Sequence, residues 1–448
     1  MYESASIEER GVPTVTLANH GFINDAESAS RAMGIPYMRY VATSVPCESS
    51  ILSDIEEGID DALDNIIEAL TRPLTPEERS PEHIDTEELE RIVFRGNLEE
   101  VNRFFYKRGW SDGLPIIPPV ESTVAEMLTG TDLPPDHLLG KLQSRYGKAT
   151  IEKIAINAVM AGCLPTYMPV LIAATINLLE SESGFNGYTT YGFSTGSWAP
   201  FWIINGPIRN QININNSSGA LSPGNIANAA IGRAIGLIIK NIGGVRKGIE
   251  DMGTIGNPMK YSLVISENEE DSPWEPLHVE LGHEKEESTI TLSFPNSYCQ
   301  HIPYTSDAKG ILEAIVDYMP IGMRYNNIIT PIHAMNLQRE GYDKERIKKY
   351  ICAHKLGPAP RVGPFVGLGP VQKQIFNGSS DKNVMVPKID DPRLIKIVVG
   401  GGPGAWIAHL TGGGATPGKK EIQKIEFPEN WDKLVNKYKD VVPKYGKY

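Results

Sequence analysis

The chain has 448 residues, a hydrophobic fraction of 41%, a charged fraction of 22% and a formal net charge of −12. These values are typical of globular proteins and exclude a disordered, collagen-like or membrane-spanning chain. The acidity argues against nucleic acid or an anionic membrane as a partner, because both are bound through basic surfaces. It is concentrated in residues 48–100, which carry 17 acidic and four basic residues. We favour a solvated helix face for this segment over a docking surface for a basic partner.

The N-terminal residues lack the charged-then-apolar pattern of a signal peptide, and no apolar run approaches the roughly 18–20 residues that span a bilayer. The chain has four cysteines, which form no CxxC pair. They are too few for a disulfide scaffold, and their spacing is not that of zinc ligands. We therefore expect a reduced, cytoplasmic protein.

Residues 1–72 are predicted to form a small flavodoxin- or Rossmann-like domain. Residues 12–17 and 38–43 have the pattern of strands, residues 24–33 that of a helix ending at Gly34, and residues 52–70 that of a long amphipathic helix. This order predicts parallel strand pairing with right-handed crossovers. The loops that follow the two strands, at Asn19 and at Cys47, would then lie at the same edge of the sheet.

Residues 73–90 are rich in proline and charge and are interpreted as a linker. Residues 91–448 are predicted to form a larger α/β domain without an internal repeat, and the alternative is a division of this domain near residue 285. We expect helices at 87–106, 151–160, 169–179, 226–241, 308–318 and 344–354, and strands at 201–204, 261–266, 289–294, 326–332 and 394–399.

The loop at residues 215–224 (NNSSGALSPG) precedes a predicted helix and is the best candidate for binding an anionic group. Small residues let backbone N–H groups point outward, and the helix N-terminus adds a partial positive charge. We assign the binding of a substrate carboxylate or phosphate to Asn216, Ser217, Ser218 and Gly219. The alternative is an ordinary glycine-rich turn capped by Asn and Ser.

A second glycine-rich loop, at residues 400–405 (GGGPGA), follows a predicted strand and formally fits G-x-G-x-x-A. A dinucleotide site also needs a full helix, a second strand and an acidic residue about 20 positions further on. We expect a helix of at most two turns before Gly412, so a nicotinamide cofactor is not assigned. Gly401 and Gly402 are predicted instead to face a substrate.

An acidic cluster at residues 267–271 also follows a predicted strand. Paired carboxylates can perform general acid–base chemistry or hold a hard cation. We take Glu267 and Glu269 as the acid–base candidates, with His278 nearby and Asp112 as a further polar candidate. The alternative is a solvated acidic turn, although the proline and tryptophan residues that follow would make this turn stiff.

A thiol step could be supplied by Cys47 or Cys163. Cys163 lies just past a predicted helix C-terminus, where the helix dipole disfavours a thiolate, so a structural role is preferred for it. Cys47 lies in a polar loop before a helix, where thiolates are favoured. The sequence contains no G-x-S-x-G elbow, no Walker loop and no H-E-x-x-H motif.

Residues 11–15 (GVPTV) and 34–36 (GIP), followed by the acidic helix, resemble the UGSC-like family of selenoproteins and their cysteine homologues. Five later stretches resemble a larger domain that accompanies this unit in the family. They are residues 109–115 (GWSDGLP), 157–163 (NAVMAGC), 205–207 (NGP), 268–276 (NEEDSPWEP) and 401–404 (GGPG). Asn205 is a further substrate-binding candidate.

Members of the family carry a Cys-(Sec or Cys)-Gly-Ser-Cys motif shortly before the segment that matches Gly11, and this sequence does not contain it. The motif implies redox or reductive-cleavage chemistry by a nucleophile of low pKa. In its absence, a separate subunit supplies the motif, Cys47 substitutes for it, or the chemistry is different.

The sequence thus predicts an α/β enzyme that acts on a small carboxylate- or amide-bearing metabolite, with thiol-linked redox or reductive cleavage as the leading chemistry. One alternative is a non-redox lyase or hydratase that uses the carboxylates. Another is a non-catalytic subunit whose partner carries the motif. The expected partners are a small-molecule substrate and either further copies of the chain or a motif-bearing subunit, while cofactor and metal stay unassigned.

Overall fold

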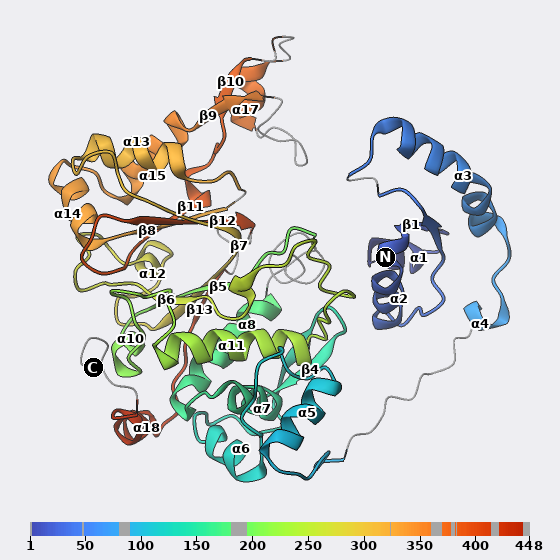
Figure 1. Cartoon of the computed structure of the whole chain (residues 1–448), viewed down its shortest axis with the longest axis horizontal. Coiled ribbons are helices and arrows are strands. Elements are labelled where there is room, and N and C mark those ends of the chain that lie inside the picture. Colours follow the sequence, from blue (N-terminus) through green and yellow to red (C-terminus); the bar gives the residue numbers. More distant parts are fainter. Residues whose placement is uncertain are drawn as a thin grey trace.

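The computed structural model describes residues 2–46, 49–79, 90–180, 195–322, 324–359, 370–377, 381, 383–413 and 421–441. Within these residues the chain is α/β, with a small parallel sheet near the N-terminus and a larger α/β body (Figure 1). None of the helices in these ranges combines the length and apolar character needed to cross a bilayer. Most of the predicted linker, residues 80–89, lies outside the described ranges.

The N-terminal unit has the predicted order of strands and helices. Its elements are α1 (Tyr2–Glu8), β1 (Thr16–Asn19), η1 (His20–Phe22), α2 (Ile23–Ala32), β2 (Tyr40–Thr43), α3 (Leu52–Thr71) and α4 (Pro76–Arg79). β1 and β2 pair in parallel, with Thr16 opposite Tyr40. Gly34 follows α2 with a φ of +77°, which confirms the glycine stop that the sequence predicts.

The body begins with helices that have clear local signals. α5 (Leu98–Lys107) starts later than predicted because Asn97 and Glu100 form a capping box there. α7 (Ile151–Ala161) is capped by the Thr150 hydroxyl and ends at the left-handed Gly162, as expected. The other elements of this part are α6 (Glu121–Leu128), β3 (Leu138–Leu142), β4 (Gly147–Thr150), η2 (Pro165–Tyr167) and α8 (Met168–Glu180).

The central sheet has the strand order β11-β8-β12-β7-β5-β6, and β13 also pairs with β7. These strands are β5 (Phe201–Asn205), β6 (Val264–Ser266), β7 (Thr289–His301), β8 (Arg324–Ile329), β11 (Ile395–Val399), β12 (Ile407–Gly413) and β13 (Ile422–Lys424). Residues 407–413 are therefore a strand and not the short helix expected from the sequence. A strand directly after the glycine loop at 400–405 excludes the strand–loop–helix of a dinucleotide fingerprint there.

The strands of the two halves of the sheet pair in the same pattern, which was not predicted from the sequence. In the first half, β5 pairs in parallel with β6 on its outer side and antiparallel with β7 on its inner side. In the second half, β8 pairs in parallel with β11 and antiparallel with β12 in the same way. β7 and β12 pair antiparallel at the centre. The body is thus built from two similar β–helix–β–β halves.

The sheet curls so strongly that its two edge strands meet. In a flat sheet of this order, β6 and β11 would be about 24 Å apart, at about 4.8 Å for each strand spacing. Instead, the Asn268 N–H just after β6 donates a hydrogen bond of 2.8 Å to the Val399 carbonyl of β11. Inside the curl, one hydrophobic cluster combines residues from both halves, including Ile203, Ile265, Ile328 and Val398.

Helices cover the two outer faces of the curled sheet (Figure 1). Below the first half, α7, α8 and α11 (Ile226–Asn241) pack against residues such as Trp202 and Val264. Above the second half, α13 (Ala308–Tyr318), α14 (Pro331–Arg339) and α15 (Lys344–His354) pack against residues such as Tyr325 and Ile397. The remaining elements are α10 (Ile208–Gln211), η3 (Pro258–Lys260), α12 (Leu277–Glu280), β9 (Leu356–Pro358), α17 (Pro370–Phe376), β10 (Met385–Pro387), η4 (Pro392–Leu394) and α18 (Trp431–Tyr438).

The N-terminal unit contacts the body through α2. The Ser28 hydroxyl donates a hydrogen bond of 2.5 Å to Glu250 and accepts one of 3.1 Å from Arg246. The Tyr146 hydroxyl lies 3.5 Å from the Met33 sulfur. Asp25 is partly buried near Glu250, and this burial together with the second carboxylate raises the pKa of Asp25 to about 7.

Candidate functional site

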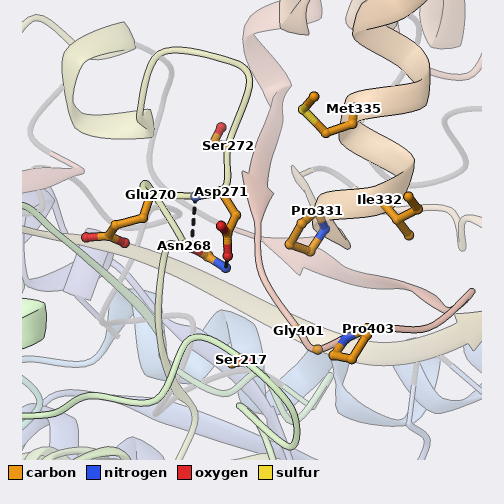
Figure 2. Close-up of a pocket in the computed structure, with 11 residues that line it drawn as sticks. Ser217, Asn268, Glu270, Asp271, Ser272, Pro331, Ile332, Met335, Gly401 and Pro403 are labelled. Carbon is orange, nitrogen blue, oxygen red and sulfur yellow. Dashed lines mark hydrogen bonds between the residues drawn. The ribbon is translucent and has the colours of Figure 1, made fainter.

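A cleft lies where the loops that follow β6, β8 and β11 meet the loop that precedes α11. Its larger chamber has a volume of about 540 Å³. Figure 2 shows a polar wall of Asn268, Glu270, Asp271 and Ser272, an apolar wall of Pro331, Ile332 and Met335, and Ser217, Gly401 and Pro403 between them. Segments that are far apart in the sequence therefore meet at strand ends, as expected for an α/β binding site.

A smaller chamber of about 320 Å³ adjoins the first, because Gly401, Gly402 and Pro403 line both. Among its other lining residues are Ser218, Gly219, Thr330, Gly400 and Trp406. Since Gly400 has no side chain, this chamber extends to Ile265 and Ile328 on the inner face of the curled sheet.

The two predicted substrate loops are in direct contact. The Gly401 N–H donates a hydrogen bond of 2.9 Å to the Asn216 carbonyl. A Cβ atom on Gly402 would collide with the Ser218 hydroxyl, so this position requires glycine for the loops to approach. Of the residues predicted to bind substrate, Ser217 lines the larger chamber, Ser218 and Gly219 line the smaller one, and Gly401 and Gly402 line both.

Several N–H groups of the loop at 215–224 are already used within the fold. The N–H groups of Ser217, Ala220 and Ser222 are used within the loop, on the Asn215 side chain and on the Ser217 and Gly219 carbonyls. At the start of α11, Asn225 caps the N–H of Asn228. The described residues that line the two chambers include the acids Glu270 and Asp271 and no lysine, arginine or histidine.

Residues that follow β8 hold the glycine loop at 400–405 in place. The Thr330 hydroxyl donates to the Gly404 carbonyl at 3.3 Å, and His333 Nε2 lies 3.1 Å from the Ala405 carbonyl. Burial lowers the pKa of His333, so a neutral ring that donates from Nε2 fits this contact. The sequence analysis selected neither Thr330 nor His333, although Thr330-Pro331 follows β8 much as Gly206-Pro207 follows β5.

Glu267 is completely buried, behind the polar wall of the cleft. Its Oε2 accepts hydrogen bonds of 2.7 Å from Asn205 Nδ2 and from the Leu277 N–H. Its Oε1 accepts from Lys344 Nζ at 3.2 Å and from the Val399 N–H at 3.4 Å. Since both oxygens are engaged and Lys344 is also buried, this carboxylate joins the two halves of the sheet.

Glu269 is held in the same cluster. Its Oε1 accepts from Asn205 Nδ2 at 3.0 Å and from the Gly206 N–H at 2.8 Å, and its Oε2 lies 2.9 Å from the Arg209 guanidinium. His278 is buried, with Nδ1 3.9 Å from Glu269 and Nε2 3.3 Å from the Lys285 carbonyl. Thus Asn205, Glu267, Glu269 and His278 come together, as predicted for one site, but none of them lines the cleft.

Arg209 explains why the acidic turn is ordered. Its buried guanidinium donates to the Gly206 and Glu267 carbonyls and to both carboxylate oxygens of Glu270. Burial opposes the ionisation of Glu270, but the hydrogen bonds from Arg209 and Asn210 outweigh it and lower the pKa of this carboxyl. The turn is therefore a clamped part of the fold and not simply a solvated surface.

Asp271 is the acidic residue of this turn that faces the cleft. Asn268 Nδ2 donates to Asp271 Oδ2 at 2.9 Å, and the Asp271 N–H donates back to Asn268 Oδ1 at 3.2 Å (Figure 2). This reciprocal pair fixes the carboxylate while the residue stays exposed. Asp271 belongs to the acidic cluster at residues 267–271 but was not among the acid–base candidates predicted from the sequence.

The other candidates lie elsewhere or outside the described residues. Asp112 forms a two-point ion pair with Arg233 of α11, at 2.8 and 3.0 Å, and so holds its loop on the helix. The Cys163 thiol is buried and donates to the Ala230 carbonyl at 3.3 Å, and burial raises its pKa. Cys47 lies outside the described residues. Within the described ranges, no group of three or more His, Cys, Asp or Glu residues has the arrangement of a metal site.

The comparison with family models decides what the N-terminal unit is. Residues 1–72 match the model of the UGSC family. This unit is UGSC-like. The match covers β1, α2, β2 and α3, which confirms the resemblance of the N-terminal residues to this family. No family model matches the rest of the chain, and no curated protein and no solved structure matches the chain.

Proposed function

We propose that this protein is an enzyme that performs acid–base chemistry on a small amide- or amino-bearing metabolite bound in the cleft. The observation that supports this is the lining of the two chambers, which offers the Asp271 carboxylate and no basic side chain among the described residues. A ligand N–H group can donate to this carboxylate, whereas a free carboxylate would be repelled by it. Of the two substrate classes that the sequence suggests, the amide is therefore favoured.

Asp271 is the proposed base. One of its oxygens is occupied by Asn268, which orients the group, and the residue borders the larger chamber. A carboxylate held in this way can accept a proton from a bound ligand, as in the addition or elimination reactions of hydratases and lyases. Ser217 and the backbone of residues 401–403 would position the ligand.

Glu267 and Glu269 are proposed to support the site without touching the substrate. Each has both carboxylate oxygens engaged by donors of the fold, which leaves little capacity to accept a further proton. Their role in this proposal is to fix the turn that carries Asn268 and Asp271.

The proposal can be tested with a defined panel of small primary amides, amino acids and hydroxy acids, with mass spectrometry to follow addition or loss of water or ammonia. We expect turnover of an amide- or amino-bearing compound, and a loss of at least about 100-fold in Asp271→Asn. The matched control is Glu275→Gln on the same exposed turn, which should retain turnover. Unchanged turnover in Asp271→Asn, or turnover of hydroxy acids alone, would contradict the proposal.

Thiol-linked chemistry is a second proposal, supported by the UGSC-family match of the segment that contains Cys47. Burial raises the pKa of Cys163, and it raises that of Cys352 to about 11, so neither is a ready nucleophile. Of the two thiol candidates that the sequence suggests, Cys47 and Cys163, this leaves Cys47 for a thiol step. If Cys47→Ser retains full activity with a reductant present, this version of the function is wrong.

A further inference from the structure

The long helix α3 of the UGSC-like unit carries more apolar surface than the described residues cover. Its side toward β2 holds the small residues Gly58 and Ala62, and Val45 of the strand's following loop packs directly against Gly58. These are the buried residues of α3. The larger side chains are turned about a quarter of a turn away from this contact.

We call these larger residues the α3 stripe: Leu52, Ile55, Ile59, Leu63, Ile66 and Leu70. They recur at three- and four-residue steps, the spacing of a helix that packs along another helix. Leu52 is 70% exposed, Leu63 48% and Leu70 38%. A regular apolar stripe with this exposure is typical of a surface that is covered in a complex.

One flank of the α3 stripe is strongly acidic. α3 contains seven aspartates and glutamates and no lysine or arginine. Glu56, Asp60 and Asp64 follow the stripe along the side opposite β2, since they are spaced four residues apart. The other flank is occupied by the contact with β2.

This asymmetry argues against a second copy of the chain as the occupant. An antiparallel twofold pairing of two α3 helices would place the acidic flank against itself. A parallel pairing would place it against the flank that β2 occupies. A helix with apolar residues at the same spacing and lysine or arginine on its flank would satisfy both the stripe and the acids.

We propose that the α3 stripe is a docking surface for an amphipathic helix of another protein, with an apolar face and a basic flank. The acidic segment is then a recognition surface. This is the docking surface for a basic partner, which was the less favoured of the two interpretations of the sequence. The two-stranded sheet behind α3 fits this role, because a sheet of two strands is marginal on its own and gains support from a partner. The proposal does not depend on the function proposed for the cleft.

The test uses the full chain and two synthetic helical peptides of about 20 residues, both with leucine at the packing positions. One carries lysine and arginine on its flanks and the other carries glutamate. We expect the basic peptide to bind by fluorescence anisotropy, with an affinity that falls as salt is raised. Leu63→Gln/Leu70→Gln should weaken this binding at least about tenfold.

Glu56→Gln/Asp60→Asn should weaken binding and reduce its dependence on salt. Ile255→Gln is the control, because Ile255 is 97% exposed and lies outside α3. Circular dichroism should show the same helix content in all variants. Equal binding of the acidic peptide, or no binding of the basic one, would overturn the proposal. A wild-type dimer that Leu63→Gln/Leu70→Gln dissociates would also overturn it, because the occupant would then be a second copy.

Discussion

The two halves of the curled sheet end in the same backbone geometry but in opposite chemistry. The Glu267 N–H after β6 donates to Ile204 of β5 at 3.2 Å, and the Gly400 N–H after β11 donates to Ile329 of β8 at 3.0 Å. In the first half, the position is filled by a buried carboxylate. In the second half, it has no side chain and a chamber lies beside it.

This difference teaches how one scaffold can provide both a closed and an open strand end. The Glu267 carboxylate is neutralised by Lys344 and bonded by groups from both halves, so its end of the sheet is filled by the chain itself. Glycine at 400 and 402 leaves the equivalent end of the other half open to a ligand. The strand end of the first half is therefore held rigidly by side-chain contacts, and the strand end of the second half leaves space for a ligand.

The largest expected loss of stability comes from removing the Glu267 carboxylate, which fills the strand end of the first half. Glu267→Ala should lower the free energy of unfolding by about 3–5 kcal/mol, because the buried Lys344 ammonium would lose its partner. Chemical denaturation followed by circular dichroism measures this. Glu275→Ala, on the exposed part of the same turn, should change stability by less than about 0.5 kcal/mol. Equal effects of the two substitutions would show that the ion pair does not hold the halves together.

A smaller loss of stability is expected at the contact between the loops at 215–224 and 400–405. Gly402→Ala should cost about 1–3 kcal/mol, because the new methyl group collides with Ser218. Gly402→Ala/Ser218→Gly should recover part of this loss, since it removes the hydroxymethyl group on the other side. Thermal unfolding of both variants gives the comparison. A double variant no more stable than Gly402→Ala would mean that the loops do not pack as described.

A still smaller change in stability is expected at the position equivalent to Glu267. A Cβ atom on Gly400 would lie 3.2 Å from the Ile265 Cδ1 and Ile328 Cγ2 methyl groups, so Gly400→Ala should cost about 1 kcal/mol or less. It should nevertheless weaken the binding of a ligand that extends from the larger chamber into the smaller one, because the added methyl group narrows the smaller chamber. The prediction fails if Gly400→Ala binds an amide of the panel as tightly as the wild type, as measured by calorimetry.

Asp25 contrasts with Glu267, because it is a partly buried carboxyl group whose charged neighbour is another carboxylate, Glu250, and not a lysine. Burial first and Glu250 second raise the pKa of Asp25 from 3.8 to about 7. The folded contact therefore binds the proton more tightly than the unfolded chain does, so its stability falls as the pH rises from about 4 to 7. Arg246 and Ser28 both donate hydrogen bonds to the Glu250 carboxylate. These hydrogen bonds favour the ionised form of Glu250, whose charge acts on Asp25.

Hydrogen-exchange protection of α2 should accordingly decrease between pH 5 and pH 8, after correction for intrinsic exchange rates. In Asp25→Asn the protection should not depend on pH over this range. A pH dependence that persists in Asp25→Asn would assign the effect to another group.

Much of the fold follows from local signals in the sequence. α11, α13 and α15 have the predicted bounds, because side-chain caps at Asn225, Asp307 and Asp343 mark their starts and their apolar residues recur with helical spacing. The curl of the sheet and its two similar halves could not be predicted, because they depend on pairings between strands more than 100 residues apart, such as that of Ile407 with His301.

Part of the candidate site could also be predicted from the sequence. Ser217, Ser218, Gly401 and Gly402 line the cleft because loops after strands of an α/β fold converge, which the strand pattern indicates. The environment of Glu267 could not be predicted, because its ion-pair partner Lys344 is 77 residues away. Without that contact, a buried carboxylate that joins two halves of a sheet has the same sequence signature as an acid–base residue.

The most direct test of the difference between the two halves is a crystal structure of the protein soaked with a small primary amide from the panel. We predict difference density in the cleft, with the amide nitrogen within hydrogen-bond distance of Asp271 and no ligand beside Glu267. Density beside Glu267, or a cleft that stays empty with an amide that the enzyme converts, would contradict the assignment of the open half as the binding site.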